Sequence, residues 1–145
     1  MSDARIELQS LLADPAQAGA YFVDARDREP LEAAARVLGY TFARVDFTGC
    51  ADKDEALARI ARALAFPDWF GANWDALFDC LCDLAPAQGY LLLLEHAEAW
   101  RAAARADFDT AVEVFNEAAA AWKARAIPFW ALLPVAADTL AALEE

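Results

Sequence analysis

Short apolar segments alternate along this chain with longer segments of helical periodicity, and this alternation constrains the fold more than any other feature. Each apolar segment is rich in aromatic and branched residues and is bounded by charged or turn-forming residues, which is typical of a buried strand. The candidate strands are Ala20 to Asp24, Thr41 to Phe47, Tyr90 to Glu95 and Ile127 to Leu133. Pro128 and Pro134 cannot donate ladder hydrogen bonds, so we expect the last candidate strand at an edge of the sheet.

Between these segments, apolar residues recur at the three- and four-residue spacing of amphipathic helices. Pro30 stands in the first turn of one such segment and Gly39 follows its end, as at natural helix boundaries. The candidate helices are Pro30 to Leu38, Asp52 to Ala65, Trp74 to Leu84 and Asp107 to Arg125. Strands that alternate with helices predict an α/β fold, in which a small, largely parallel sheet of three to four strands packs with helices.

The length and the charge of the chain limit its organisation and its partners. Its 145 residues suffice for one domain with a real core, and no fixed-period repeat or Pro/Gly/Ser linker divides them. Twelve Lys and Arg stand against twenty-four Asp and Glu, a formal charge of −12. Such a chain is repelled by nucleic acids and by anionic membranes, so we expect neither as a partner. Acidity also serves solubility alone, so the positions of the charges are more informative than their sum.

The cysteines and the single histidine indicate an intracellular protein without a metal or a cofactor. Cys50, Cys80 and Cys82 cannot all pair within one chain, and the last two share a predicted helix, so we expect reduced thiols. One histidine, His96, and no second cysteine pair argue against a metal site. The first residues lack the pattern of a signal peptide, and no apolar run approaches the length of a membrane span. We therefore expect a cytoplasmic protein.

One stretch of the chain is acidic and contains no cation. Between Ala63 and Trp100 there is no Lys or Arg, whereas this stretch holds Asp68, Asp75, Asp79, Asp83, Glu95 and Glu98. Asp75, Asp79 and Asp83 are four residues apart and share one face of a predicted helix, where like charges cost about 0.2–0.5 kcal/mol per pair. A merely solvated acidic face explains the polarity but not the missing cations.

Aromatic residues are concentrated near the start of the same stretch. They are Trp69, Phe70, Trp74 and Phe78. One short helix cannot point all of them inward, and aromatic rings beside unpaired carboxylates are typical of protein-binding hot spots. Trp74 fits the core equally well. We expect Gly71 to supply the backbone angle that turns the loop into the helix, and Asn73 to cap it.

The segment from Pro67 to Asp79 reads Pro-acid-aromatic-aromatic-Gly-x-Asn-x-Asp-Ala-Leu-aromatic-Asp and resembles the signature of the barstar family of ribonuclease inhibitors. The resemblance extends over roughly Thr41 to Leu133, with a helix before the motif and a strand after it. It implies a barstar-like domain of residues 41-145. Residues 1-40 would then be an N-terminal extension, an additional strand and helix packed on the same domain.

The resemblance implies that the chain is an inhibitor, of the immunity or antitoxin kind. It would bind and block the active site of a basic, barnase-like ribonuclease or nuclease toxin. The acidic helix and the loop before it would stand in for RNA phosphates, and the free protein would be a monomer. Asp79 matches the central carboxylate of the family, Trp69 and Phe78 replace a Tyr and a Trp, and Asp83 is an acid that the family pattern lacks. The partner-binding residues are then Trp69, Asn73, Asp75, Phe78, Asp79, Asp83 and Glu117.

Two other functions remain open on the sequence. A barstar-like scaffold could serve as an interaction module for a different basic protein. Alternatively, Asp75 and Asp79 could form a carboxylate pair for acid–base or metal chemistry. The enzyme hypothesis is disfavoured because the two project from one helix face and because the chain has no Ser-His-Asp set, P-loop or metal quartet. We therefore expect no catalytic residue, and His96 is interpreted as a lone surface residue.

Overall fold

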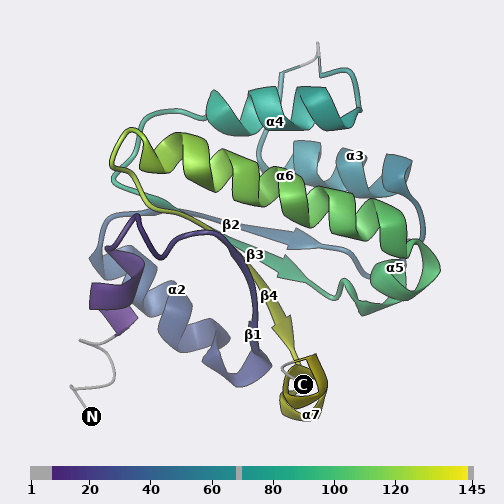
Figure 1. Ribbon diagram of the computed structural model, residues 1–145, viewed down its shortest axis with the longest axis horizontal. Helices are drawn as coiled ribbons and strands as arrows, with labels where there is room; N and C mark the ends of the chain where they lie inside the picture. Colours follow the sequence, from purple (N-terminus) through teal and green to yellow (C-terminus); the bar gives the residue numbers. More distant parts are fainter. Residues whose placement is uncertain (1–7, 68–69, 144–145) are drawn as a thin grey trace.

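Four parallel strands form one sheet within residues 8–67 and 70–143, the part of the chain that a computed structural model describes. The strand order is β1-β4-β3-β2, so β1 and β2 are the edges (Figure 1). The strands are β1 (Ala20–Asp24), β2 (Thr41–Asp46), β3 (Tyr90–Glu95) and β4 (Phe129–Val135). The predicted α/β fold with a small parallel sheet is confirmed.

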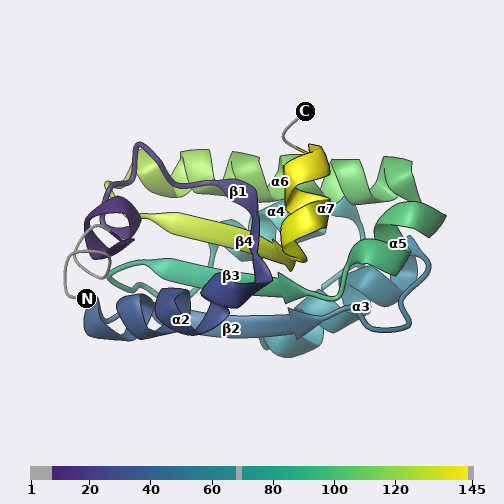
Figure 2. The ribbon, with the colours of Figure 1, turned by 90° about the horizontal axis from the view of Figure 1, so that it is seen from below.

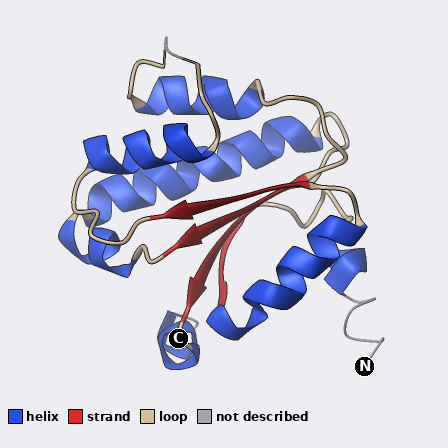
Figure 3. Ribbon diagram, turned by 180° about the vertical axis from the view of Figure 1, so that it is seen from behind, coloured by secondary structure: helices blue, strands red, loops and turns tan. Residues whose placement is uncertain are grey.

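Helices cover both faces of the sheet (Figure 3). One face carries α3 (Lys53–Ala63), α4 (Trp74–Cys82) and α6 (Arg105–Lys123). The other carries α2 (Arg28–Val37), which follows the 3₁₀ helix η1 (Ala25–Asp27), and a helical segment at residues 8–12. The short helices α5 (Glu98–Ala103) and α7 (Ala137–Leu143) follow β3 and β4 at the carboxyl ends of the strands (Figure 2). Within the described ranges, none of the helices has the length and apolarity needed to cross a membrane.

β3 is apolar at every position except its last because both of its faces are buried. Leu92 and Leu94 belong to the larger core, which α3, α4 and α6 complete. Leu91 and Leu93 belong to the smaller core beneath α2. Two-sided burial is the rule for strands of a parallel sheet that has helices on both faces, and it explains why this strand does not alternate with polar residues.

β4 lies inside the sheet, between β1 and β3, so the prediction that its prolines place it at an edge is wrong. Pro128 precedes the first residue of the strand. Pro134 lies within it, but the ladder between β4 and β3 ends at Leu132. The backbone N–H of Ala131 donates to the carbonyl of Gly19, on the β1 side. Successive backbone N–H groups of a strand point to opposite sides, so the nitrogen of Pro134, three residues later, points toward β3. At that position the ladder between β4 and β3 has already ended. The missing donor therefore removes no ladder hydrogen bond.

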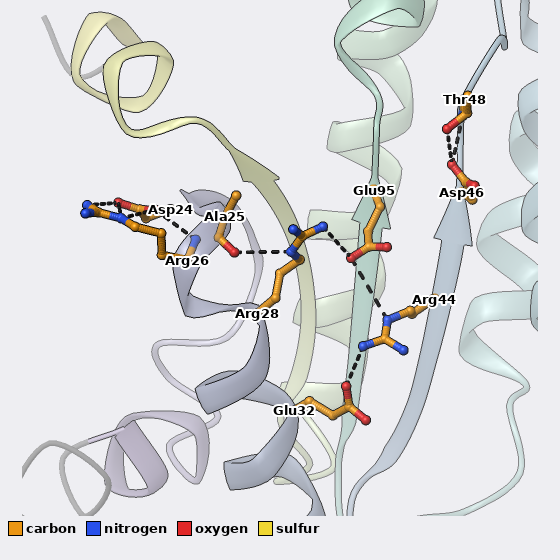
Figure 4. Close-up of polar contacts among 9 residues, drawn as sticks. All are labelled: Asp24, Ala25, Arg26, Arg28, Glu32, Arg44, Asp46, Thr48 and Glu95. Carbon is orange, nitrogen blue, oxygen red and sulfur yellow. Dashed lines mark hydrogen bonds and ion pairs between the residues drawn. The ribbon is translucent and has the colours of Figure 1, made fainter. Parts of the chain in front are cut away.

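An ion-pair network joins α2 to the sheet beside the carboxyl end of β3 (Figure 4). The guanidinium of Arg28 lies 3.3 Å from the Glu95 carboxylate, and that of Arg44, on β2, lies 4.0 Å from it. Arg44 also pairs with Glu32 of α2. The stretch of sequence around Glu95 holds no cation, yet α2 and β2 bring cations to it. Local sequence charge therefore does not decide whether this carboxylate is paired.

Candidate functional site

The acidic helix α4 begins at Trp74, and the three residues before it shape its first turn. The side-chain oxygen of Asn73 accepts a hydrogen bond from the backbone N–H of Ala76 at 2.8 Å, so the predicted cap is confirmed. The left-handed backbone belongs to Ala72, with φ of 50°, and not to Gly71, for which that prediction is wrong. Gly71 favours the cap for a different reason. A Cβ at this position would lie only 3.2 Å from the side-chain amide nitrogen of Asn73, so glycine leaves room for the capping side chain.

The other end of α4 is held by one donor from α6 and by a second from Arg125, which follows the end of α6 at Lys123. The buried indole Nε1 of Trp122 donates to the carbonyl oxygen of Leu81 at 2.9 Å. The guanidinium of Arg125 donates to the carbonyl oxygen of Cys82 at 3.3 Å. Carbonyls in the last turn of a helix have no partner within the helix, so these donors satisfy two of them. With Leu77 also buried in the core, α4 is fixed in position against α6.

The predicted acidic face of α4 points to solvent. Asp75 and Asp79 are exposed and lie one helical turn apart, with Asp75 in the first turn, where the helix dipole stabilises an anion. Asp83 is also exposed, but it is the residue that follows the last helical position. Among the residues that the structure describes, no Lys or Arg nitrogen lies within 4.0 Å of any of these three carboxylates.

A groove of about 510 Å³ lies between α4 and α6, and we call it the acidic groove. Four carboxylates line it, from Asp75 and Asp79 on α4 and from Glu113 and Glu117 on α6. The remaining lining residues are Trp74, Phe78, Thr110 and Val114. Both aromatic rings are partly buried and pack against the main core, so Trp74 belongs to the core and to the groove wall together.

The acidic groove brings together four of the residues that the sequence singled out, namely Asp75, Phe78, Asp79 and Glu117. Asn73 and Asp83 do not line it, because the first caps α4 and the second follows its far end. Trp69 lies outside the described residues, as does Asp68 of the motif.

Glu113 is the charged residue of the groove that the sequence analysis missed. It precedes Glu117 by four residues, so helical periodicity alone places the two carboxylates on one face of α6. That signal was present in the sequence. What the sequence did not indicate is that this face of α6 lies against α4, because the contact depends on how the two helices share the core.

The chemistry of the acidic groove suits a cationic protein surface. Four carboxylates with no ion-pair partner in the described chain create a strongly negative potential, and the aromatic walls offer apolar contact area beside it. Within residues 8–67 and 70–143, no three His, Cys, Asp or Glu side chains are placed to hold a metal ion together. Arginine and lysine side chains of another molecule are the natural complement of this surface.

Fold and groove together define an acidic α/β domain that presents four carboxylates along one groove. The family model described as Barstar (barnase inhibitor) matches residues 40–134, which is more than half of the chain. The chain therefore belongs to the barstar family, and the resemblance inferred from the motif is confirmed. None of the curated proteins compared with the chain matches it. The matched region contains the acidic groove, whereas β1 and α2 precede it and still pack on the same sheet.

Proposed function

We propose that this protein inhibits a basic, barnase-like ribonuclease or nuclease toxin by placing its acidic groove over the active site of that enzyme. The observation that carries the proposal is the set of four groove carboxylates that have no counter-ion within the described chain. An enzyme that cleaves RNA gathers cations to bind phosphates, and carboxylates held at a fixed spacing compete for the same cations.

Within the proposed interface, Asp79 is the central contact. It lies one turn into α4, next to the partly buried ring of Phe78, which excludes water from the contact and so strengthens the attraction between charges. Asp75 and Glu117 flank it from the two helices. Trp69, Asn73 and Asp83 are proposed as contacts at the edge of the interface. The protein acts by binding alone, as a cytoplasmic monomer when free, and none of its residues is catalytic.

The net charge of −12 supports this mode of action. A negative field around the inhibitor attracts a basic nuclease over several ångströms, and raises the rate of association at low ionic strength. Salt screens exposed charges with a Debye length of about 8 Å at physiological ionic strength. Association is therefore expected to slow as salt is added, whereas dissociation, which depends on the close contacts, changes less.

The test is titration calorimetry of the full chain against a purified barnase-like ribonuclease at low and at high salt, with RNA cleavage measured in parallel. We expect a one-to-one complex, loss of cleavage and weaker binding at high salt. Asp79→Asn should lower the affinity by about 2–5 kcal/mol, roughly 30- to 5,000-fold, because a cation of the partner is left unpaired. Asp54→Asn is the matched control, since it removes the same charge from an exposed site on α3 outside the groove.

Two outcomes would overturn the proposal in different ways. If the two variants bind equally well, the acidic groove is not the interface. If barnase-like ribonucleases do not bind, while a different basic protein binds in a manner that depends on Asp79, the chain is an interaction module built on the barstar scaffold and not a ribonuclease inhibitor.

A further inference from the structure

A second cavity, of about 230 Å³, lies at the carboxyl end of the sheet and shares no lining residue with the acidic groove. It is bounded by the ends of β3 and β4, by α5 and α6, and by α7; Figure 2 shows α5 and α7 beside the strand ends. Its apolar walls include Phe22, Leu94, Phe108, Leu133, Val135 and Leu143. We call it the sheet-end cavity.

Arg101 is the only cationic side chain lining the sheet-end cavity among the described residues. Its guanidinium carbon lies 5.7 Å from the ring centre of Phe22 and 5.9 Å from that of Phe108. The two rings stack on each other at 6.2 Å between centres, so the charge lies beside this stacked pair, which lines the cavity. Its Nε is buried and has no hydrogen-bond partner in the described chain, and the side chain forms no ion pair there.

An unpaired buried donor on a charged group is rare in folded proteins, because its desolvation is not offset by a hydrogen bond. The two rings contribute cation–π attraction to the guanidinium, but a ring face does not replace a hydrogen-bond acceptor in the plane of Nε. Glu98, one turn before Arg101 on α5, also lines the cavity, yet its carboxylate is not within ion-pair distance of Arg101. An acceptor beyond the described residues would therefore satisfy the Nε donor of Arg101.

The place of the cavity in the topology is also one where α/β sheets bind ligands. After β1 the chain turns to α2 on one face of the sheet, whereas after β3 it continues to α6 on the other face. In open parallel sheets, ligands bind outside the carboxyl ends of the strands, which is where this cavity lies. Leu94 of β3 and Val135 of β4 bring the carboxyl ends of these two strands into the cavity wall, and Phe22 contributes from the middle of β1.

We propose that the sheet-end cavity binds a small monocarboxylate with an apolar body about the size of one aromatic ring. The carboxylate would accept from the guanidinium of Arg101, and the body would contact the rings of Phe22 and Phe108. An apolar cavity of roughly 150 Å³ holds benzene, so 230 Å³ holds a ring with a carboxylate attached but is smaller than the pockets that hold drug-sized ligands. The Glu98 carboxylate disfavours a ligand with a second negative charge.

The test uses phenylacetate as the probe and phenylacetamide as its neutral counterpart of the same shape, with calorimetry and thermal unfolding of the full chain as readouts. We expect phenylacetate to bind saturably, with a dissociation constant on the order of 1 mM or lower, and to raise the unfolding temperature. The amide should bind at least about tenfold more weakly, since it carries no charge for Arg101. Failure of phenylacetate to bind, or equal binding of the amide, would overturn the proposal.

Variants of the cavity give a second line of evidence. Arg101→Met keeps the apolar stem of the side chain and should weaken phenylacetate binding at least about tenfold. Arg105→Met, an exposed arginine outside the cavity that pairs with Asp109, should leave it unchanged. Glu98→Gln removes the nearby negative charge and should strengthen binding. Phenylacetate affinity that is the same in Arg101→Met as in the unmodified protein would contradict the assignment.

A further variant keeps the proposal testable if Arg101→Met does not fold. Ala102 lines the cavity but is exposed to solvent, so Ala102→Phe narrows the cavity without placing a larger side chain in the core. Phenylacetate binding should be lost in this variant, and full binding would overturn the proposal. Inhibition of a ribonuclease should be unaffected in every one of these variants, because none of the altered residues lines the acidic groove.

Discussion

The indole nitrogen of Trp122 donates a buried hydrogen bond, 2.9 Å long, to the carbonyl oxygen of Leu81, and thereby joins α6 to the last turn of α4. The same indole packs on the ring of Tyr90, at 4.8 Å between ring centres, so the contact is anchored to β3 as well. The groove carboxylates come from these two helices. Their spacing therefore depends on a hydrogen bond between residues forty-one positions apart in the sequence.

Trp122→Phe should lower the free energy of unfolding by more than the loss of ring volume explains. The substitution leaves the Leu81 carbonyl without its donor, which costs about 1–3 kcal/mol when the acceptor is buried. Trp100→Phe is the matched control, because the Nε1 of Trp100 is buried and has no hydrogen-bond partner in the described chain. Urea denaturation compares the two variants, and equal losses of stability would show that the Trp122 hydrogen bond contributes nothing.

Asp79→Ala should leave the free protein as stable as before or slightly more stable. Asp75 lies four residues before Asp79 on α4, and a like-charged pair at this helical spacing costs about 0.2–0.5 kcal/mol; Asp83, just past the helix end, adds further negative charge nearby. Alanine also has the better helix propensity. Thermal unfolding at low salt measures the change. A variant that is clearly destabilised and retains its affinity for a ribonuclease would make Asp79 a structural residue and not a binding residue.

Ala72→Gly should stabilise the loop before α4 by up to about 1 kcal/mol. A left-handed backbone is strained for alanine and not for glycine. We expect the free energy gained by relieving this strain to exceed the free-energy cost of the larger conformational entropy that glycine has in the unfolded chain. The same substitution at Ala58, an exposed position inside α3, should instead cost about 0.5–1 kcal/mol. Chemical denaturation of both variants tests the opposite signs, and a loss of stability at Ala72 would contradict the strain argument.

The Asp24 carboxylate should make the stability of the protein depend on pH in the acid range. The Arg26 side chain and, next, the Arg26 backbone N–H donate hydrogen bonds to it and lower its pKa from the ordinary value of 3.8 to about 2. Because the pKa of Asp24 is lower in the folded than in the unfolded protein, its ionised carboxylate adds to the free energy of unfolding. This contribution is complete above about pH 4 and disappears as the pH falls toward 2. In thermal unfolding, Asp24→Asn should therefore be less stable than the unmodified protein at neutral pH, and this difference in stability should vanish near pH 2. A deficit that is independent of pH would exclude this linkage.

Much of the secondary structure could be predicted because its signals are local. The strands at Ala20–Asp24 and Tyr90–Glu95 agree with their predicted bounds, and the Asn73 cap follows from its position before Trp74. Two of the wrong predictions concern Pro134 and Gly71. Both rest on the role that the residue type most often has, whereas the actual role depends on what lies beside the residue, namely the end of a ladder for the proline and the Asn73 side-chain amide for the glycine.

The sequence by itself determined the alternation of strands and helices, the acidic face of α4 and the membership of the barstar family, because periodicity, capping and a motif of fixed spacing are all read along the chain. Only the tertiary structure decided which charges remain without partners. It brought Arg28 and Arg44 to Glu95, placed Glu113 in the groove beside α4, and left the Nε of Arg101 without an acceptor among the residues that the structure describes. The physical reason is that apolar burial in the two cores selects which helix faces meet, and side chains distant in sequence become neighbours as a consequence of that packing.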